Sequence, residues 1–229
     1  MRVRNEALAE VQSLQDLQSG RLRIGANEST GNYLLPKLIR TFHQQHPKIR
    51  VEVLRNHSAT LLNDLREDLV DLALISFHPE DKDIEETPLT SDPLVLIASA
   101  KHPLCEKRRV HIRQLGEESF IAHGVPSPSR TRVIEAFRQY ETPLKISMEI
   151  SSLETIKRLV AMGLGIAFVP LMCVREETGR GEIARIPVEG FTHERSLFLV
   201  RRRAHAHSFA AQEFLRIIRM REVGRKPPN

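Results

Sequence analysis

The sequence lacks most of the residues that point to a specialised class of protein. It has no tryptophan, only two cysteines and 5% aromatic residues over 229 positions. Cys105 and Cys173 belong to no CxxC pattern, so we expect free thiols in a reducing compartment rather than a disulfide or a metal site. No apolar run approaches the roughly 20 residues of a membrane helix, and the N-terminus lacks the apolar centre of a secretory signal. We therefore expect a cytoplasmic protein.

Sequence motifs of catalysis are missing as well. There is no GxSxG, Walker loop or HExxH motif, and Gly163-x-Gly165 follows a helix pattern and precedes a strand pattern, the reverse of a dinucleotide-binding loop. His205-Ala206-His207 is a weak metal motif and is better interpreted as an exposed loop. His78 and His123 have no evident carboxylate partner, which favours polar lining over acid–base catalysis. We expect no enzyme activity, no metal and no cofactor.

The positive charge raises the question of a nucleic-acid partner. The formal charge is +5 and the pI is about 9.5. The densest basic runs are Lys107-Arg108-Arg109 and Arg201-Arg202-Arg203, each next to a predicted strand or turn. The other cations are spread among 29 acidic residues, whereas a DNA-binding surface concentrates positive charge on one element. Both runs are therefore interpreted as solvated surface.

Hydrophobic periodicity predicts alternating strands and helices in the first third of the chain. The spacing i, i+3, i+4, i+7 from Leu35 to Phe42 predicts a helix, and Ser58 begins another. Residues 72–76, LALIS, form a continuous apolar run, as in a strand covered on both faces. The predicted order is strand 21–26, helix 32–45, strand 49–54, helix 58–68 and strand 72–76. This order indicates an α/β fold with a parallel, doubly wound sheet.

A second α/β unit is predicted after a strand at 93–99. Its expected elements are strand 119–122, helix 130–140, strand 146–150, helix 153–162, strand 165–169, a short helix to about 177 and strand 183–188, followed by a last strand at 196–201 and a helix at 208–222. Residues 1–19 have the spacing of an amphipathic helix ended by Gly20, with a disordered tail as the alternative. We predict two α/β units joined near residues 98–101.

A series of short motifs extends from residue 20 to residue 220. They are Gly20-x-Leu22-Arg23-Ile24-Gly25, Leu34-Leu35-Pro36, Phe42-x-x-x-His46-Pro47, Val51-x-Val53, Asp71-Leu72-Ala73-Leu74, His102-Pro103-Leu104 and Val160-Ala161-x-Gly163-x-Gly165-Ile166-Ala167-x-Val169-Pro170. In this order and spacing the sequence resembles the effector-binding domain of LysR-type bacterial transcription regulators. Each motif is weak alone, but the whole series in register is specific.

The resemblance implies two Rossmann-like lobes of the periplasmic-binding-protein type II kind, joined by a two-strand hinge. Lobe I would hold residues 20–98 and 195–223, lobe II residues 99–194, and residues 224–229 would form a flexible tail. Residues 1–19 would be the end of a linker helix, and the helix-turn-helix DNA-binding domain would be absent from this chain. The resemblance further implies a homodimer or homotetramer that senses a small-molecule effector in the inter-lobe cleft and contacts DNA only through the missing domain.

The expected site lies where helices begin at the C-terminal ends of parallel strands, since helix N-termini present free N–H groups and partial positive charge. Ser29 and Thr30 lie at the start of the first helix and match a position where members of the family often hold an effector oxygen. The full set of expected ligand-binding residues is Ser29, Thr30, Ser58, Ser76, Phe77, His123, Ser127, Ser129, Arg130, Thr131, Phe168 and Val169.

Several of these residues have a structural alternative. Ser29, Ser58 and Ser129 are suited to N-capping, worth roughly 1 kcal/mol each. Arg130 is suited to a surface position as well as to clamping an effector carboxylate. Glu28 would repel a carboxylate or another anion, so either its side chain turns outward or the effector is zwitterionic, cationic or neutral. Two other functions stay open, a solute-binding protein of a transporter and, less favoured, an enzyme on the same two-lobe fold.

Overall fold

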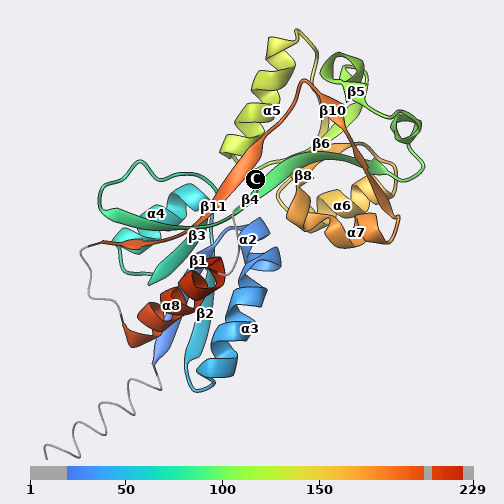
Figure 1. Ribbon diagram of the computed structural model, residues 1–229. Coiled ribbons are helices and arrows are strands. Elements are labelled where there is room, and N and C mark those ends of the chain that lie inside the picture. Colours follow the sequence, from blue (N-terminus) through green and yellow to red (C-terminus); the bar gives the residue numbers. More distant parts are fainter. Residues whose placement is uncertain (1–19, 204–207, 224–229) are drawn as a thin grey trace, which may run out of the picture. The chain divides into compact units, whose positions relative to one another are not determined.

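The computed structural model describes residues 20–203 and 208–223 (Figure 1). The expected linker helix at 1–19, the expected tail at 224–229 and the His205–His207 motif lie outside these residues. The described residues divide into two compact units: unit 1 contains residues 20–90, 197–203 and 208–223, and unit 2 contains Ser91–Ser196. The chain passes between them within β4 (Ile84–Ser99) and β11 (Glu194–Arg202). No helix in the described ranges is long and apolar enough to cross a membrane.

Unit 1 is built on a sheet whose first three strands are parallel. β1 (Arg21–Ala26) pairs with β2 (Arg50–Arg55) along its whole length and with β3 (Leu72–Ile75) on its other side. β11 runs antiparallel to β3, and the strand order is β2-β1-β3-β11-β4. All four residues of β3 are buried, as expected for a strand covered on both faces.

The helices of unit 1 are α2 (Glu28–Tyr33), α3 (Leu35–Gln45), α4 (Ser58–Arg66) and α8 (Phe209–Val223). The prediction of one helix over 32–45 is wrong at its start, because Asn27 already caps a helical segment at Glu28. The prediction that α4 extends to residue 68 is also wrong. Asp68 has a left-handed φ of 54° that turns the chain, and the next residue, Leu69, is 50% exposed.

The sheet of unit 1 packs against helices on both faces. On one face Leu61 and Leu65 of α4 contact the strands, and a Cβ added at Gly25 would lie only 2.6 Å from Leu61 Cδ2. On the α3 and α8 side, the rings of Phe42 and Phe214 meet edge to face at 5.3 Å. β2 forms the edge of the sheet, and its Val53 is 49% exposed.

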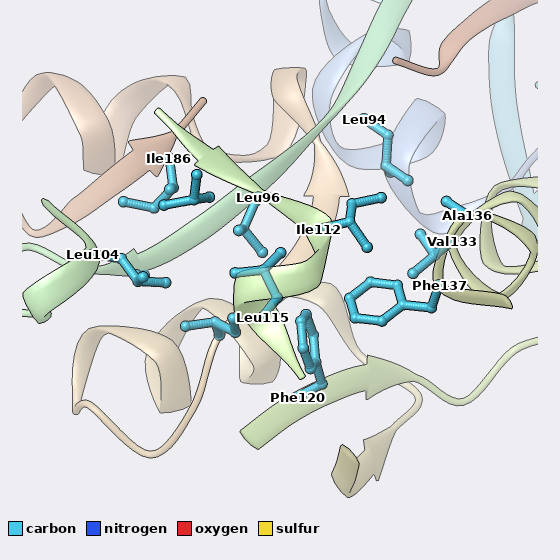
Figure 2. Packing of buried hydrophobic residues seen from close by; sticks show 13 residues of the cluster. Leu94, Leu96, Leu104, Ile112, Leu115, Phe120, Val133, Ala136, Phe137 and Ile186 are labelled. Carbon is cyan, nitrogen blue, oxygen red and sulfur yellow. The ribbon is translucent and has the colours of Figure 1, made fainter. Parts of the chain in front are cut away.

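Unit 2 combines antiparallel and parallel pairs. The second half of β4 pairs antiparallel with β8 (Ala167–Pro170) and β9 (Ile183–Ile186), while β6 (Ser119–His123) and β7 (Lys145–Ile150) pair in parallel. Its remaining elements are η1 (Pro103–Glu106), β5 (Val110–His111), η2 (Ile112–Leu115), α5 (Pro128–Gln139), α6 (Leu153–Ala161), η3 (Leu171–Cys173), α7 (Arg175–Gly179) and β10 (Val188–Glu189). Figure 2 shows its core, in which Ile112, Leu115, Phe120 and Phe137 converge.

Two buried ion pairs stabilise unit 2. Arg195 Nη2 lies 2.7 Å from Asp92 Oδ2, and the two side chains are 6% and 1% exposed. Lys157 of α6 is 5% exposed. Its Nζ lies 2.7 Å from Glu177 Oε1 of α7 and donates to the carbonyl oxygen of Cys173 at 2.9 Å. Each of these charges faces an opposite charge, and Asp92 and Lys157 form a further hydrogen bond with the backbone, which offsets part of the desolvation.

Candidate functional site

The C-terminal end of β1 leads directly into Asn27, which caps α2. Its Oδ1 accepts hydrogen bonds from the backbone N–H of Thr30 at 3.0 Å, from the Ser29 hydroxyl at 3.0 Å and from the Thr30 hydroxyl at 3.1 Å. A flipped amide would place its NH₂ group against the backbone N–H of Thr30. These contacts therefore fix the orientation of the amide: Oδ1 faces the N-terminus of α2, and Nδ2 points away from it.

The NH₂ group of Asn27 joins two more strand ends to the site. Nδ2 donates to Ser58 Oγ at 2.8 Å and lies 3.4 Å from Ser76 Oγ. Ser58 begins α4 after β2, and Ser76 directly follows β3. Asn27, Ser29, Thr30, Ser58 and Ser76 thus form one polar group, the Asn27 cluster, at the ends of β1 and β3 and the start of α4. The structure brings four predicted residues together around a fifth that the sequence analysis missed.

Burial separates the members of the Asn27 cluster into two roles. Ser29 is 4% exposed and Thr30 is fully buried, so they orient the Asn27 amide from inside the protein. Ser58 and Ser76 are partly exposed. Since both serine oxygens act as acceptors toward Asn27, their O–H hydrogens remain available to donate to another acceptor. The cluster is therefore suited to bind an oxygen atom of a ligand.

The structural alternative, in which the three serines are N-caps, does not hold for any of them. Asn27 caps α2 in place of Ser29, and Ser127 caps α5 in place of Ser129 by accepting from the backbone N–H of Arg130 at 3.2 Å. Ser58 is the first residue inside α4, whose N-cap position, His57, supplies no side-chain hydrogen bond. The α4 N-terminus therefore presents backbone N–H groups without a side-chain cap beside the Asn27 cluster.

The other predicted residues of unit 1 lie near these strand ends. Phe77 is partly buried and packs against the apolar cluster beneath α4. His78 has a carboxylate partner after all, because its Nδ1 lies 2.8 Å from Glu86 Oε2. Glu28 lies in the first turn of α2, and its Oε2 atom is buried, so the carboxylate is not turned wholly to solvent.

In unit 2 the predicted residues of the β6–α5 segment bind one another. Arg130 Nη1 donates to the carbonyl oxygen of His123 at 2.8 Å, and Nη2 forms an ion pair with Glu149 of β7. The His123 ring lies 3.2 Å from the carbonyl oxygen of Ser151. Thr131 is exposed, and its hydroxyl donates to the carbonyl oxygen of Ser127. Arg130 would have to break its ion pair with Glu149 in order to bind a ligand carboxylate.

Ser129 adds a histidine that the sequence analysis did not single out. Its hydroxyl lies 3.3 Å from His193 Nε2. Burial lowers the pKa of His193, and the nearby positive charges of Arg132 and Arg195 lower it further. His193 is therefore neutral at pH 7, and its Nε2 can either accept a hydrogen bond from the Ser129 hydroxyl or donate one to it.

Val169 lies in the interior of unit 2, and Phe168 is partly buried against its core. The Phe168 ring is stacked with Phe120 at 6.1 Å and lies 4.7 Å from Phe191, and Val169 is fully buried opposite Val95. Phe168 also lines an apolar cavity of about 460 Å³ together with Phe191. No group of three or more metal-ligating side chains occurs within residues 20–203 and 208–223.

The sequence matches the family model described as the LysR substrate binding domain over residues 15–222. It is 33% identical over 205 residues to the HTH-type transcriptional activator CmpR of Synechocystis, covering 90% of this chain and 67% of that protein. It is 31% identical over 204 residues to the RuBisCO operon transcriptional regulator of Allochromatium vinosum, covering 89% and 67%. The chain thus spans about two thirds of the length of these curated relatives.

Solved structures agree with this assignment. The regulatory domain of CcmR from Synechocystis in complex with 2-PG superposes with a TM-score of 0.80 at 27% identity, covering 92% of this chain and all of that one. The effector-binding domain of QuiR in complex with shikimate has a TM-score of 0.74 at 22% identity, covering 87% and 95%, and supports the fold alone. The chain belongs to the LysR substrate-binding domain family and is an effector-binding domain of the type II periplasmic-binding-protein-like fold. The sequence-based resemblance is confirmed, and the sensor function is favoured over the transporter alternative.

Proposed function

We propose that this LysR-type effector-binding domain binds a small anionic metabolite through the Asn27 cluster of unit 1 and responds to it without catalysing a reaction. The proposal rests on one observation: the NH₂ group of Asn27 donates hydrogen bonds to the hydroxyl oxygens of Ser58 and Ser76. Each hydroxyl is thereby prepared to donate to a ligand oxygen. A hydrogen bond to a charged acceptor is worth about 1.5–3 kcal/mol, more than one to a neutral group.

The charge of the proposed effector follows from its surroundings. The N-terminus of α4 begins at Ser58 without a side-chain cap, and its N–H groups favour negative charge. Glu28 opposes this preference from the first turn of α2. An effector that carries an anionic group together with a hydrogen-bond donor satisfies both groups. The regulatory domain of CcmR was solved in complex with 2-PG, which makes 2-PG the first compound to test.

The absence of catalysis is part of the proposal. The Asn27 cluster consists of one amide and four hydroxyls, and none of these is a base that would activate a nucleophile. The relatives are named as transcription regulators, which supports a role in controlling transcription. We further propose a cytoplasmic homodimer or homotetramer that reads its operator through a helix-turn-helix domain of the whole protein.

The predicted ligand contacts in unit 2 stay predictions. They are His123, Ser127, Ser129, Arg130, Thr131, Phe168 and Val169. Among them, Ser127 and Arg130 are engaged with their own segment, and Val169 is buried. The ligand contacts proposed first are therefore Ser58 and Ser76, with Asn27, Ser29 and Thr30 as the residues that position them.

The test is calorimetric titration of the chain with 2-PG and a panel of other small phosphates and carboxylates. We expect one class of compound to bind and to raise the melting temperature, and Ser58→Ala to weaken its binding about tenfold, the value of one charge-assisted hydrogen bond. Ser152→Ala is the matched control. Ser152 caps α6 in unit 2, so its removal should lower stability and leave effector affinity unchanged. Unchanged affinity in both Ser58→Ala and Ser76→Ala, or chemical conversion of the bound compound, would contradict the proposal.

A further inference from the structure

The two basic runs of the sequence have different surroundings in the structure. In unit 1, Arg201 forms an ion pair with Glu85 at 2.7 Å, and Arg202 forms one with Asp68 at 3.0 Å. Arg203 donates to the carbonyl oxygen of Lys82. The charge of this run is largely balanced by its own unit, so its interpretation as ordinary surface stands.

Lys107, Arg108 and Arg109 behave differently. They connect η1 to β5 in unit 2, and all three side chains are exposed. Lys107 has extended backbone angles, φ −89° and ψ 128°, so the chain leaves η1 without folding back on itself. None of the three forms an ion pair with any residue that the structure describes. Their charge is thus fully available to a partner.

Two further cations adjoin this segment. β5 pairs with β10, and the Val110 N–H donates to the carbonyl oxygen of Pro187, which places Arg109 next to the end of the strand that carries Arg185. Lys101 precedes η1, which packs against β9. Lys101 and Arg185 are both exposed and also have no ion pair within the described residues. We call Lys101, Lys107, Arg108, Arg109 and Arg185 the basic surface of unit 2.

The acidic residues on the same segments do not cancel this charge. Glu106 at the end of η1 and Glu189 in β10 are exposed, which leaves the basic surface with an excess of cations. Glu118 and Glu182 are engaged elsewhere, Glu118 with His102 and Glu182 with Arg180. Exposed cations at close spacing without internal counter-ions are a typical footprint for a polyanion.

We propose that the basic surface of unit 2 contacts the phosphate backbone of double-stranded DNA, independently of base sequence. Lys and Arg side chains bind phosphate oxygens, and the release of counter-ions from the duplex drives such contacts. DNA is favoured as the partner because the curated relatives are named as transcription regulators, and a second copy of this chain, with its net charge of +5, is a poor counterpart. The proposal revises the expectation that DNA is contacted only through a helix-turn-helix domain.

The test measures binding of the chain to a fluorescently labelled duplex of random sequence, about 30 base pairs long, over a series of salt concentrations beginning near about 50 mM. The variant combines Lys107→Gln, Arg108→Gln and Arg109→Gln. Its matched control combines Arg138→Gln, Arg158→Gln and Arg175→Gln, which removes the same charge from exposed positions on α5, α6 and α7 that have no ion pair in the described residues.

We expect the variant with Lys107, Arg108 and Arg109 replaced, the loop variant, to bind DNA at least about fivefold more weakly. The slope of log affinity against log salt concentration should become less steep by about 2 to 3, since each lost phosphate contact contributes about 0.9 to this slope. The control variant is expected to change the affinity less than about twofold. Circular dichroism and the effector-induced melting shift should be unchanged in both variants. Loss of DNA binding and loss of effector binding are thereby distinguished.

Three results would overturn the inference. The first is no binding of the unaltered chain to the duplex at the lowest salt concentration. The second is an equal loss of affinity in the loop and control variants, which would mean that charge acts diffusely. The third is binding of a poly-glutamate peptide with the same affinity and the same dependence on Lys107, Arg108 and Arg109, which would assign the basic surface to an acidic protein partner.

Discussion

The carboxylate of Asp92 accepts a hydrogen bond from the guanidinium group of Arg195 at 2.7 Å, and both side chains are buried. The second oxygen of Asp92 accepts from the backbone N–H of Met172 at 2.9 Å. Asp92 belongs to β4 and Arg195 to β11, the two strands through which the chain passes between its units. The pair therefore fixes both strands at the point where they enter unit 2.

Removal of Asp92 should destabilise the protein strongly. Asp92→Ala leaves the guanidinium of Arg195 buried without its counter-charge, and we expect a loss of about 3–5 kcal/mol in the free energy of unfolding, measured by urea denaturation. The neighbouring Ser91–Glu194 contact, on the same two strands but exposed, is the control. Glu194→Ala should cost less than about 0.5 kcal/mol. Similar losses in the two variants would show that the buried Asp92–Arg195 pair contributes no more to the free energy of unfolding than an exposed contact.

Two substitutions of Asn27 separate its helix cap from its role in the proposed site. Asn27→Ala removes both the cap of α2 and the contacts with Ser58 and Ser76, so we expect a loss of about 1 kcal/mol in stability together with loss of effector binding. Asn27→Asp keeps an oxygen for the backbone N–H of Thr30 but replaces the donor NH₂ by a charged oxygen. We expect it to retain stability while anion binding is abolished.

Thermal melts and calorimetric titration, performed on both Asn27 variants, distinguish these effects. If Asn27→Asp binds the anionic effector as tightly as the unaltered chain, the amide NH₂ does not organise the site.

The Lys157–Glu177 pair should limit stability at both extremes of pH. Burial alone would lower the pKa of Lys157, but its hydrogen bonds to Glu177 and Glu154 raise it above the ordinary 10.5. Its contribution is complete below pH 10.5 and is lost as pH rises through the folded-state pKa. Burial acts to raise the pKa of Glu177, but the bond to Lys157 lowers it below 4.5. That contribution is present above pH 4.5 and is lost as pH falls through the folded-state value.

We expect Lys157→Met to flatten both ends of the curve of unfolding free energy against pH. The measurement is urea denaturation at closely spaced pH values. Lys145→Met is the control, because Lys145 pairs with Glu117 at the surface of the same unit. An unchanged pH dependence in Lys157→Met would contradict the assignment.

Gly165 should tolerate no side chain. A Cβ there would lie 2.7 Å from the carbonyl oxygen of Ser119 and 3.0 Å from a side-chain carbon of Ile121, so we expect Gly165→Ala to cost about 1–3 kcal/mol by overpacking. Gly179, at the end of α7, has no atom within 4 Å of the corresponding position. Gly179→Ala should be neutral or stabilising by up to about 1 kcal/mol, and differential scanning calorimetry compares the two.

The elements that the sequence predicted well are those whose apolar pattern is strong. β3 is a continuous buried run, α6 buries Leu153, Ile156 and Val160, and α8 buries Ala210, Phe214, Ile217 and Ile218. The first half of β4 was missed, because Glu85, Glu86 and Pro88 resemble a loop. Its pairing depends on distant residues, such as Arg201, which lies 116 positions from Glu85. The two-residue pair of β5 and β10 has no local signal at all.

The Asn27 cluster shows a similar limit of sequence reasoning. The hydroxyls of Ser29, Thr30, Ser58 and Ser76 were predicted because they follow strands or begin helices. Asn27 was missed because the helix was predicted to begin near residue 32, where the apolar spacing starts, whereas residues 28–31 are polar and small. Asparagine directly after a buried strand, a favoured N-cap residue, was the available signal. The assignment of the basic runs likewise depends on carboxylates remote in sequence.

The close approach at Gly25 limits how a sensor for another compound can be engineered from this chain. Leu61 Cδ2 of α4 occupies the space that a Cβ at Gly25 would need, so any replacement of Gly25 requires the buried Leu61 side chain to move. The same helix carries Ser58 at its first position. Libraries that diversify Ser58 and Ser76 while leaving Gly25 and Leu61 untouched would alter ligand preference on an unchanged scaffold.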